Sequence, residues 1–187
     1  AKIISMSLGG IGDTSASLEN ELKSAVAKGA VVVVSSGNCG SGCPDVLSCG
    51  SFRGVTWPGN SPSVVTVGAV DDATKVACFS SGESISGVGV KPDFVGPGVD
   101  VKSSVPGSGY ATKSGTSMAA PHVSGAVALL LGKSPQLRQD DVKRVLEKTA
   151  LDLGDIGKDT SYGFGLIDMA KALAYKEGLE VIVELEK

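Results

Sequence analysis

A serine at the mouth of an apolar helix is the side chain best placed for chemistry. The segment Gly115–Gly125 reads Gly-Thr-Ser-Met-Ala-Ala-Pro-His-Val-Ser-Gly and delivers Ser117 to the apolar run Ala119–Leu131. The first N–H groups of a helix have no intrahelical acceptor and carry partial positive charge. Such a place suits a nucleophile whose attack builds negative charge on a neighbouring oxygen. Taken alone, a serine here is more often only a helix cap.

The base that would activate this serine is not evident. His122 is the single histidine of the chain and follows Ser117 by five positions. Five residues turn a helix by about 500°, which leaves the two side chains roughly 140° apart around the axis. We therefore expect a structural role for His122. Lys113 is an alternative base, but nothing in the sequence indicates the burial that a lysine needs to lose its proton.

Asn38 is a second candidate, at the end of a run of β-branched residues. The segment Val31–Asn38 reads Val-Val-Val-Val-Ser-Ser-Gly-Asn. Ligands of α/β sheets bind at the carboxyl ends of the strands, and a side-chain amide can donate to an oxyanion. A turn asparagine in a left-handed conformation is the alternative. We favour the oxyanion role.

Strand and helix patterns alternate along the chain, which predicts a mostly parallel sheet covered on both faces. The long segment Ser35–Ser63 is expected to be a functional loop. No repeat or linker divides residues 1–187, so we expect one domain. The predicted strands are Ile3–Leu8, Ala30–Val34, Ser63–Val70, Asp93–Val95, Val99–Ser103 and an edge strand at Leu179–Leu185, and the predicted helices are Ser17–Lys28, Ala119–Leu131, Gln136–Thr149 and Leu166–Tyr175.

Composition excludes several classes of protein. The chain has 187 residues, 42% of them hydrophobic, and a net charge of -3, which is enough for one domain with a real core. There is no basic patch for nucleic acid and no apolar run long enough to cross a membrane. The segment Gly107–Ser114 is only part of a phosphate-binding loop, because Thr112 replaces a required glycine and no helix follows at once.

Three of the four cysteines, Cys39, Cys43 and Cys49, fall within one loop rich in glycine and serine. Their spacing does not match the two close pairs of a zinc ribbon. Instead it suits one disulfide within the loop, as in a secreted protein. We expect Cys78 to be a buried free thiol.

The Ser117 segment resembles the nucleophile motif of the subtilisin-like serine proteases. Further segments match that family in order: Ile4–Gly10, Val31–Asn38, Trp57–Val70 and Tyr162–Asp168. The match runs from about Ile3 to about Ala174 and leaves 178–187 as a C-terminal extension. The resemblance implies a three-layer α/β sandwich, with the family's N-terminal strands and helices absent from this chain.

The resemblance also implies a serine endopeptidase that forms an acyl-enzyme at Ser117, with Asn38 and the Ser117 N–H as oxyanion donors. In subtilisin the triad residues follow the order Asp, His, Ser. The Asp and His are therefore expected from an upstream segment, since the chain begins inside a strand and reads as a fragment. The isolated chain would then be inactive. The alternative is a non-enzymatic peptide-binding or assembly module that retains the fold.

The family's substrate pocket maps onto small, uncharged positions that favour an apolar or medium-sized side chain. Main chain beside that pocket could pair with an extended peptide. The predicted pocket residues are Ser7, Leu8 and Gly9 on one side, Ser36 and Gly37 on the other, and Thr56 near the floor.

No cofactor is expected for the chemistry, but the resemblance implies a weak structural site for calcium or sodium. Its ligands would be the carbonyls of Gly59, Ser61 and Val64 with the Asp93 carboxylate, oxygen ligands that hard cations prefer. Trp57–Pro58 matches a position that tends to be cis. Expected partners are a polypeptide substrate, the upstream segment, a propeptide and a second copy at the exposed sheet edge. The expected location is extracellular.

Overall fold

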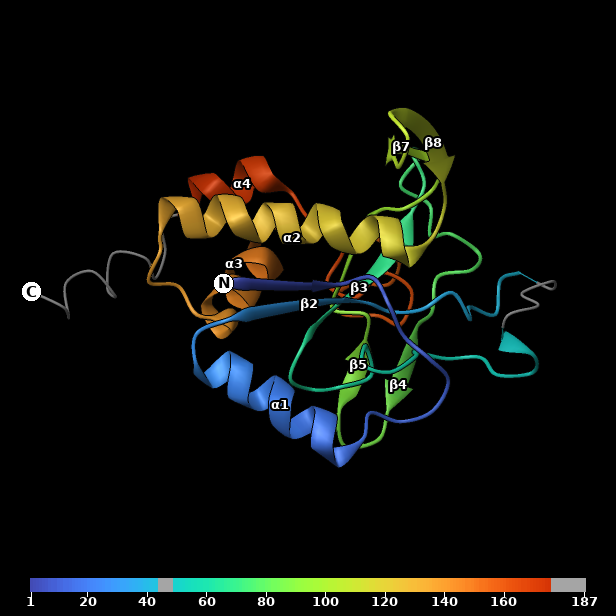
Figure 1. The fold of residues 1–187 in the computed structure, drawn as a ribbon, viewed down its shortest axis with the longest axis horizontal. Coiled ribbons are helices and arrows are strands. Elements are labelled where there is room, and N and C mark those ends of the chain that lie inside the picture. The colour runs from blue at the N-terminus through green and yellow to red at the C-terminus, as the bar shows by residue number, and fades with distance from the viewer. Residues whose placement is uncertain (44–48, 176–187) are drawn as a thin grey trace, which may run out of the picture.

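The computed structural model describes residues 1–43 and 49–175 (Figure 1). A four-stranded parallel sheet has the order β1-β2-β3-β6. Two antiparallel hairpins, β4–β5 and β7–β8, stand apart from it. The strands are β1 (Ile3–Met6), β2 (Val31–Ser35), β3 (Val65–Val70), β4 (Glu83–Ile85), β5 (Gly89–Lys91), β6 (Phe94–Pro97), β7 (Val101–Val105) and β8 (Gly109–Lys113), and the helices are α1 (Ala16–Ala27), α2 (Thr116–Lys133), α3 (Gln139–Thr149) and α4 (Met169–Ala174).

The valine run of β2 explains the layers of the fold. Successive side chains of a strand point to opposite faces. Val31 and Val33 accordingly pack in a cluster with residues of α2 and α3, whereas Val32 and Val34 pack with Leu22 of α1. Helix α1 covers one face of the sheet, and α2 with α3 and α4 covers the other (Figure 1). The predicted three-layer α/β architecture is confirmed.

Helix α2 begins earlier than predicted, at Thr116 rather than Ala119, so Ser117 lies inside its first turn. At its other end the chain also differs from expectation. The predicted helix Leu166–Tyr175 is shortened to Met169–Ala174, because Leu166 forms bridges with Val95 and Leu151 instead of helical bonds. The predicted strand Val99–Ser103 lies at Val101–Val105, and Leu179–Leu185 lies outside the described residues.

The structure contains two disulfides. Cys39–Cys49 has a Cα–Cα distance of 5.6 Å and confirms a bridge within the loop. Cys43–Cys78, at 5.0 Å, shows that the expectation of a free Cys78 thiol was wrong. The chain after β3 folds back against the loop, where Gly40 N–H donates to Phe79 O at 2.9 Å, so residues far apart in sequence come together.

Trp57–Pro58 is cis, as the resemblance implies, and Lys91–Pro92 is cis as well. Over the stretches 1–43 and 49–175, no helix is both long and apolar enough to span a bilayer.

Candidate active site

Ser117 is the second residue of α2, so its N–H has no acceptor within the helix. Its Oγ lies 3.5 Å from the carbonyl oxygen of Ser7, in the segment after β1. Gly115 precedes the helix, and a Cβ there would lie 3.4 Å from Asn38 Nδ2. That distance is an ordinary contact, so glycine is favoured here by its backbone φ of 157° rather than by lack of space.

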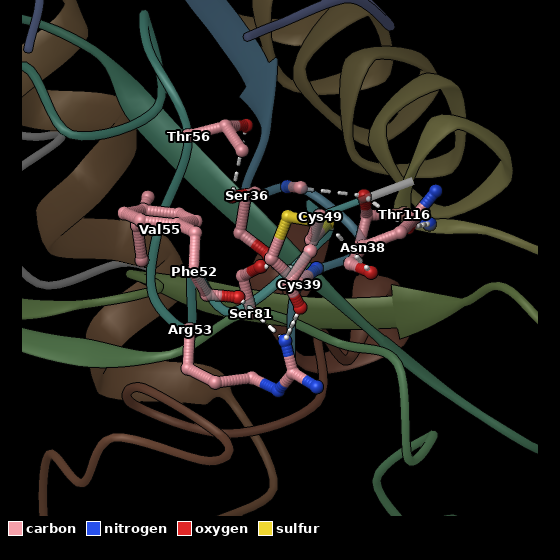
Figure 2. Close-up of a disulfide and its surroundings, with 12 residues drawn as sticks. Ser36, Asn38, Cys39, Cys49, Phe52, Arg53, Val55, Thr56, Ser81 and Thr116 are labelled. Carbon is pink, nitrogen blue, oxygen red and sulfur yellow. Dashed lines mark hydrogen bonds between the residues drawn. A yellow bond between two sulfur atoms is a disulfide. The ribbon is translucent and has the colours of Figure 1, made fainter. Parts of the chain in front are cut away.

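Asn38 is oriented by the residue before the serine. Its Oδ1 accepts from Thr116 N–H at 2.9 Å and from Thr116 Oγ1 at 3.0 Å. Since a backbone N–H can only donate, the atom facing it must be the amide oxygen. The Nδ2 group is therefore left as a free donor within the described residues, close to Gly115. Thr116 Oγ1 also accepts from Gly37 N–H at 3.2 Å, which ties the end of β2 to the start of α2 (Figure 2).

A proline in α2 links the serine to the segment after β1. Pro121 has no N–H, so the carbonyl of Ser117, four residues earlier, lacks its helical donor. The Ser7 hydroxyl donates to this carbonyl at 2.8 Å instead. The sequence pattern gave no signal for this bond, which fixes Ser7 beside the nucleophile.

A cleft of about 470 Å³ opens beside Ser117, and no residue that lines it is charged. It brings together Ser117 and Asn38 with all but one of the predicted pocket residues. Ser36 is the exception, because its side chain is fully buried and its carbonyl accepts from Thr56 N–H at 3.0 Å. The lining residues are Ser7, Leu8, Gly9, Gly10, Ile11, Ser35, Gly37, Asn38, Cys39, Cys49, Thr56, Thr116 and Ser117.

Thr56 fits between the two walls of this cleft because both walls are glycine there. A Cβ on Gly9 would lie 2.7 Å from Thr56 Oγ1, and one on Gly37 would lie 2.5 Å from it. Both distances are below any normal contact, so the side chain occupies space that only glycines leave. Cys39, which follows Asn38 and was expected at the rim of the pocket, and its disulfide partner Cys49 form part of the lining (Figure 2).

Neither residue considered as a base in this chain contacts the serine hydroxyl. His122 Nδ1 lies 2.8 Å from Met118 O of its own helix. Lys113 is exposed on β8. A second hollow, lined by Ser117, Met118, His122 and residues 101–103, adjoins the serine on the side of the β7–β8 hairpin.

Three of the four predicted cation-ligand oxygens, those of Gly59, Val64 and Asp93, accept hydrogen bonds from this chain, and the cation site stays a prediction. Lys91 Nζ donates to two of them, Val64 O at 3.0 Å and Asp93 Oδ2 at 2.7 Å. The Gly59 carbonyl accepts from a threonine hydroxyl, and the Ser61 hydroxyl donates to Glu19 at 2.5 Å. Residues 1–43 and 49–175 contain no cluster of three acidic, histidine or cysteine side chains suited to a metal.

Asp93 is 1% exposed and is surrounded by three lysines. Besides Lys91, its carboxylate contacts Lys158 Nζ at 2.8 Å and Lys143 Nζ at 3.6 Å. Burial alone would raise the pKa of Asp93, but these ammonium groups outweigh burial and hold its pKa below the ordinary value. Burial lowers the pKa of Lys91 to about 8, because the attraction of Asp93 offsets only part of the cost of burying an ammonium.

Comparison with known proteins identifies the family. The model described as the subtilase family matches residues 1–165. The chain belongs to the subtilase family. It is similar to subtilisin DY of Bacillus licheniformis, with 41% identity over 91% of this chain and 56% of the relative. It is 40% identical to subtilisin E of Bacillus subtilis and 38% identical to alkaline elastase YaB of a Bacillus strain, over 91% of this chain in both cases and 40% and 39% of those relatives.

The chain spans 56% of subtilisin DY and 40% of subtilisin E, about half the length of the relatives it matches.

Proposed function

We propose that this chain is the part of a subtilisin-like serine endopeptidase that carries the nucleophile Ser117 and the oxyanion donor Asn38. The observation that carries the proposal is the bond from Thr116 N–H to Asn38 Oδ1, 2.9 Å long. It fixes the side-chain amide so that Nδ2 and the Ser117 N–H, at the start of α2, are the available donors. Two donors aimed at one point are what a developing oxyanion needs.

In the proposed reaction, a base removes the proton of Ser117 Oγ as this oxygen attacks the carbonyl carbon of a peptide. The carbonyl oxygen becomes negative and accepts from Asn38 Nδ2 and the Ser117 N–H. Collapse of the intermediate expels the amine, which takes the proton from the base, and leaves an ester on Ser117. Water then hydrolyses the ester by the same steps.

The base and its acidic partner come, in this proposal, from an upstream segment. Two features of the chain support this source. Strand β1 pairs with β2 on one edge, and no described strand pairs with its other edge. The α2 residues Pro121, His122 and Leu129 are exposed. An added strand and helix would cover both and bring side chains into the hollow beside Ser117 and His122.

The substrate is proposed to be a polypeptide bound in extended form along Ser7–Gly9. The absence of charge among the cleft residues supports a preference for an apolar side chain of small or medium size before the cleaved bond. Two disulfides support an extracellular location. A propeptide and a second copy of the chain remain proposed partners for the open edge of β1.

The test is labelling of Ser117 by a fluorophosphonate, which reacts with an activated serine. The chain is produced alone and together with the upstream segment of its own precursor. We expect labelling and peptide hydrolysis only in the combined sample, and neither in Ser117→Ala. Hydrolysis by the chain alone, or hydrolysis that survives Ser117→Ala, would overturn the proposal.

A binding module is the second candidate, because the main chain of Ser7–Gly9 lies beside an uncharged cleft that could hold an extended peptide. Peptide binding without labelling in the combined sample would favour it over the peptidase.

A further inference from the structure

The Cys39–Cys49 disulfide lies where the oxyanion donor and the cleft meet (Figure 2). Cys39 directly follows Asn38, and Cys49 Sγ lies 3.6 Å from the Asn38 carbonyl oxygen. Both cysteines line the cleft, yet they are only 2% and 6% exposed. The bridge is therefore a packed part of the cleft wall rather than a crosslink on the outer surface.

Hydrogen bonds from other segments also hold the backbone around Asn38 and Cys39. Cys39 N–H donates to Ser81 Oγ at 2.8 Å, and Gly54 N–H donates to Cys39 O at 3.3 Å. Ser81 N–H donates to Gly37 O at 3.0 Å. With these bonds on one side and the disulfide on the other, the backbone around Asn38 has little freedom to move outward.

The second disulfide offers a natural comparison. Neither Cys43 nor Cys78 lines the Ser117 cleft. Cys78 instead borders a separate hollow with Gly40 and Gly42. The two bridges thus share a loop but differ in whether they touch the cleft.

We propose that the Cys39–Cys49 disulfide is a specificity-determining wall of the cleft, which excludes large aromatic side chains and holds the backbone of Asn38 in place. This inference rests on the proposed function for its consequence in catalysis. Its physical basis is general. Sulfur is apolar and polarisable, and a covalent bridge prevents the adaptation that a flexible wall would allow. Thr56 limits the cleft at the floor, and the disulfide limits it at the side.

The experiment compares Cys39→Ser/Cys49→Ser with Cys43→Ser/Cys78→Ser as the matched control. Binding of the peptides acetyl-Ala-Ala-Pro-X, with X leucine or phenylalanine, is measured on the chain itself. Hydrolysis of the matching p-nitroanilides is measured with the upstream segment added. We expect the preference for leucine over phenylalanine to fall about tenfold in the first variant, within the range that pocket contacts provide, and less than twofold in the control.

A loss of fold stability would not produce the expected difference between the two variants. The two bridges close loops with sequence separations of 10 and 35 residues. Removal of the longer one is expected to destabilise the fold more. Equal changes in both variants, or no change in the first, would overturn the proposal. If kcat in the first variant instead falls equally for every X, the disulfide only holds Asn38 in place. The proposal that it determines specificity would then be wrong.

Two further measurements cover the case in which the first variant does not fold. Cys39→Ala/Cys49→Val refills the wall without a crosslink, and we expect it to recover part of the leucine preference. In the Cys43→Ser/Cys78→Ser background, dithiothreitol reduces the remaining bridge to two thiols while its own two thiols close into a cyclic disulfide. Loss of preference on reduction supports the proposal, and unchanged preference contradicts it. Peptide binding is measured without hydrolysis. The binding preference therefore still tests the role of the disulfide if the peptidase proposal is wrong.

Discussion

The Ser117 cleft and the Asp93 cluster differ in the charge of the side chains that form them. The cleft, at the carboxyl end of β2, is lined by neutral groups alone. The cluster, just before β6, places one buried carboxylate among three ammonium groups. A permanent buried charge needs full opposite charges to be tolerated. A charge that exists only during reaction is better met by fixed dipoles, which cost nothing when it is absent.

This difference predicts which property each region controls. Changes in the cluster should alter the free energy of unfolding and leave the cleft intact. Changes in the cleft should alter catalysis or binding, which changes in the cluster leave unaffected.

The largest effect is expected from Asp93→Asn. It leaves Lys91, which is 3% exposed, without its anionic partner. Removing one member of a buried pair costs about 3–5 kcal/mol, which urea unfolding at pH 7 would measure. Asp168→Asn is the control, because its partner Lys171 is 62% exposed and ion pairs in water contribute little to stability. Similar losses in both variants would break the comparison.

The same pair should depend on acid. The pKa of Asp93 is lowered in the folded protein, so its contribution is complete above the unfolded value of about 4 and is lost as the pH falls below it. The stability difference between wild type and Asp93→Asn should therefore shrink between pH 5 and pH 2. A difference that stays constant over this range would show that charge is not its source.

Asn38→Ala should have the second largest effect, on catalysis in the presence of the upstream segment. Subtilisin itself is the reference case for losing this donor, with a loss in kcat on the order of 10²- to 10³-fold. We expect a loss of that order here, with KM nearly unchanged. The two bonds that Asn38 Oδ1 accepts from Thr116 are also lost, which should lower the free energy of unfolding by about 1–3 kcal/mol. A small catalytic loss with a large drop in melting temperature would instead make Asn38 a structural residue.

Thr116→Val should have a smaller effect. It removes the hydroxyl that bonds both Asn38 Oδ1 and Gly37 N–H, while the Thr116 N–H bond to Asn38 remains. Two neutral bonds contribute about 1–3 kcal/mol together, so unfolding and kcat should each change within that range. Thr116→Ser keeps the hydroxyl and serves as the control. Equal behaviour of the two variants would exclude the hydroxyl as the element that orients Asn38.

Removal of cations should have the smallest effect. Because Lys91 Nζ already contacts Val64 O and Asp93, exchange of calcium and sodium for a chelator and choline should shift the melting temperature of this chain by less than about 2 °C, which is below roughly 0.5 kcal/mol. Lys91→Met offers a contrast, since it removes the internal cation. A large shift in the melting temperature of the unmodified chain would support the predicted cation site.

Local patterns sufficed for the parts of the fold that rest on local physics. The valine run of β2 requires burial on both faces, and the turn before Ser117 requires small residues, so both could be predicted. The start of α2 at Thr116 was missed because the prediction followed the apolar run, and the first residues of the helix precede that run. Leu166 was misassigned because its partners, Val95 and Leu151, are distant in sequence.

The missed features of the site also depend on contacts between distant segments. Cys78 meets Cys43 only after the chain turns back beyond β3. Lys91 reaches Val64 O only once β5 lies beside the start of β3. Nothing in the spacing of these residues encodes either meeting.

The bond from Ser7 to the Ser117 carbonyl has an evolutionary consequence. Pro121 creates the need for an outside donor, and the Ser7 hydroxyl meets it. Selection on either position is thereby conditional on the other. Among relatives, a residue with an N–H at the position of Pro121 should release the position of Ser7 to vary, whereas proline should restrict it to side chains that donate. The pair would then be inherited as one unit, although 114 positions separate its members along the chain.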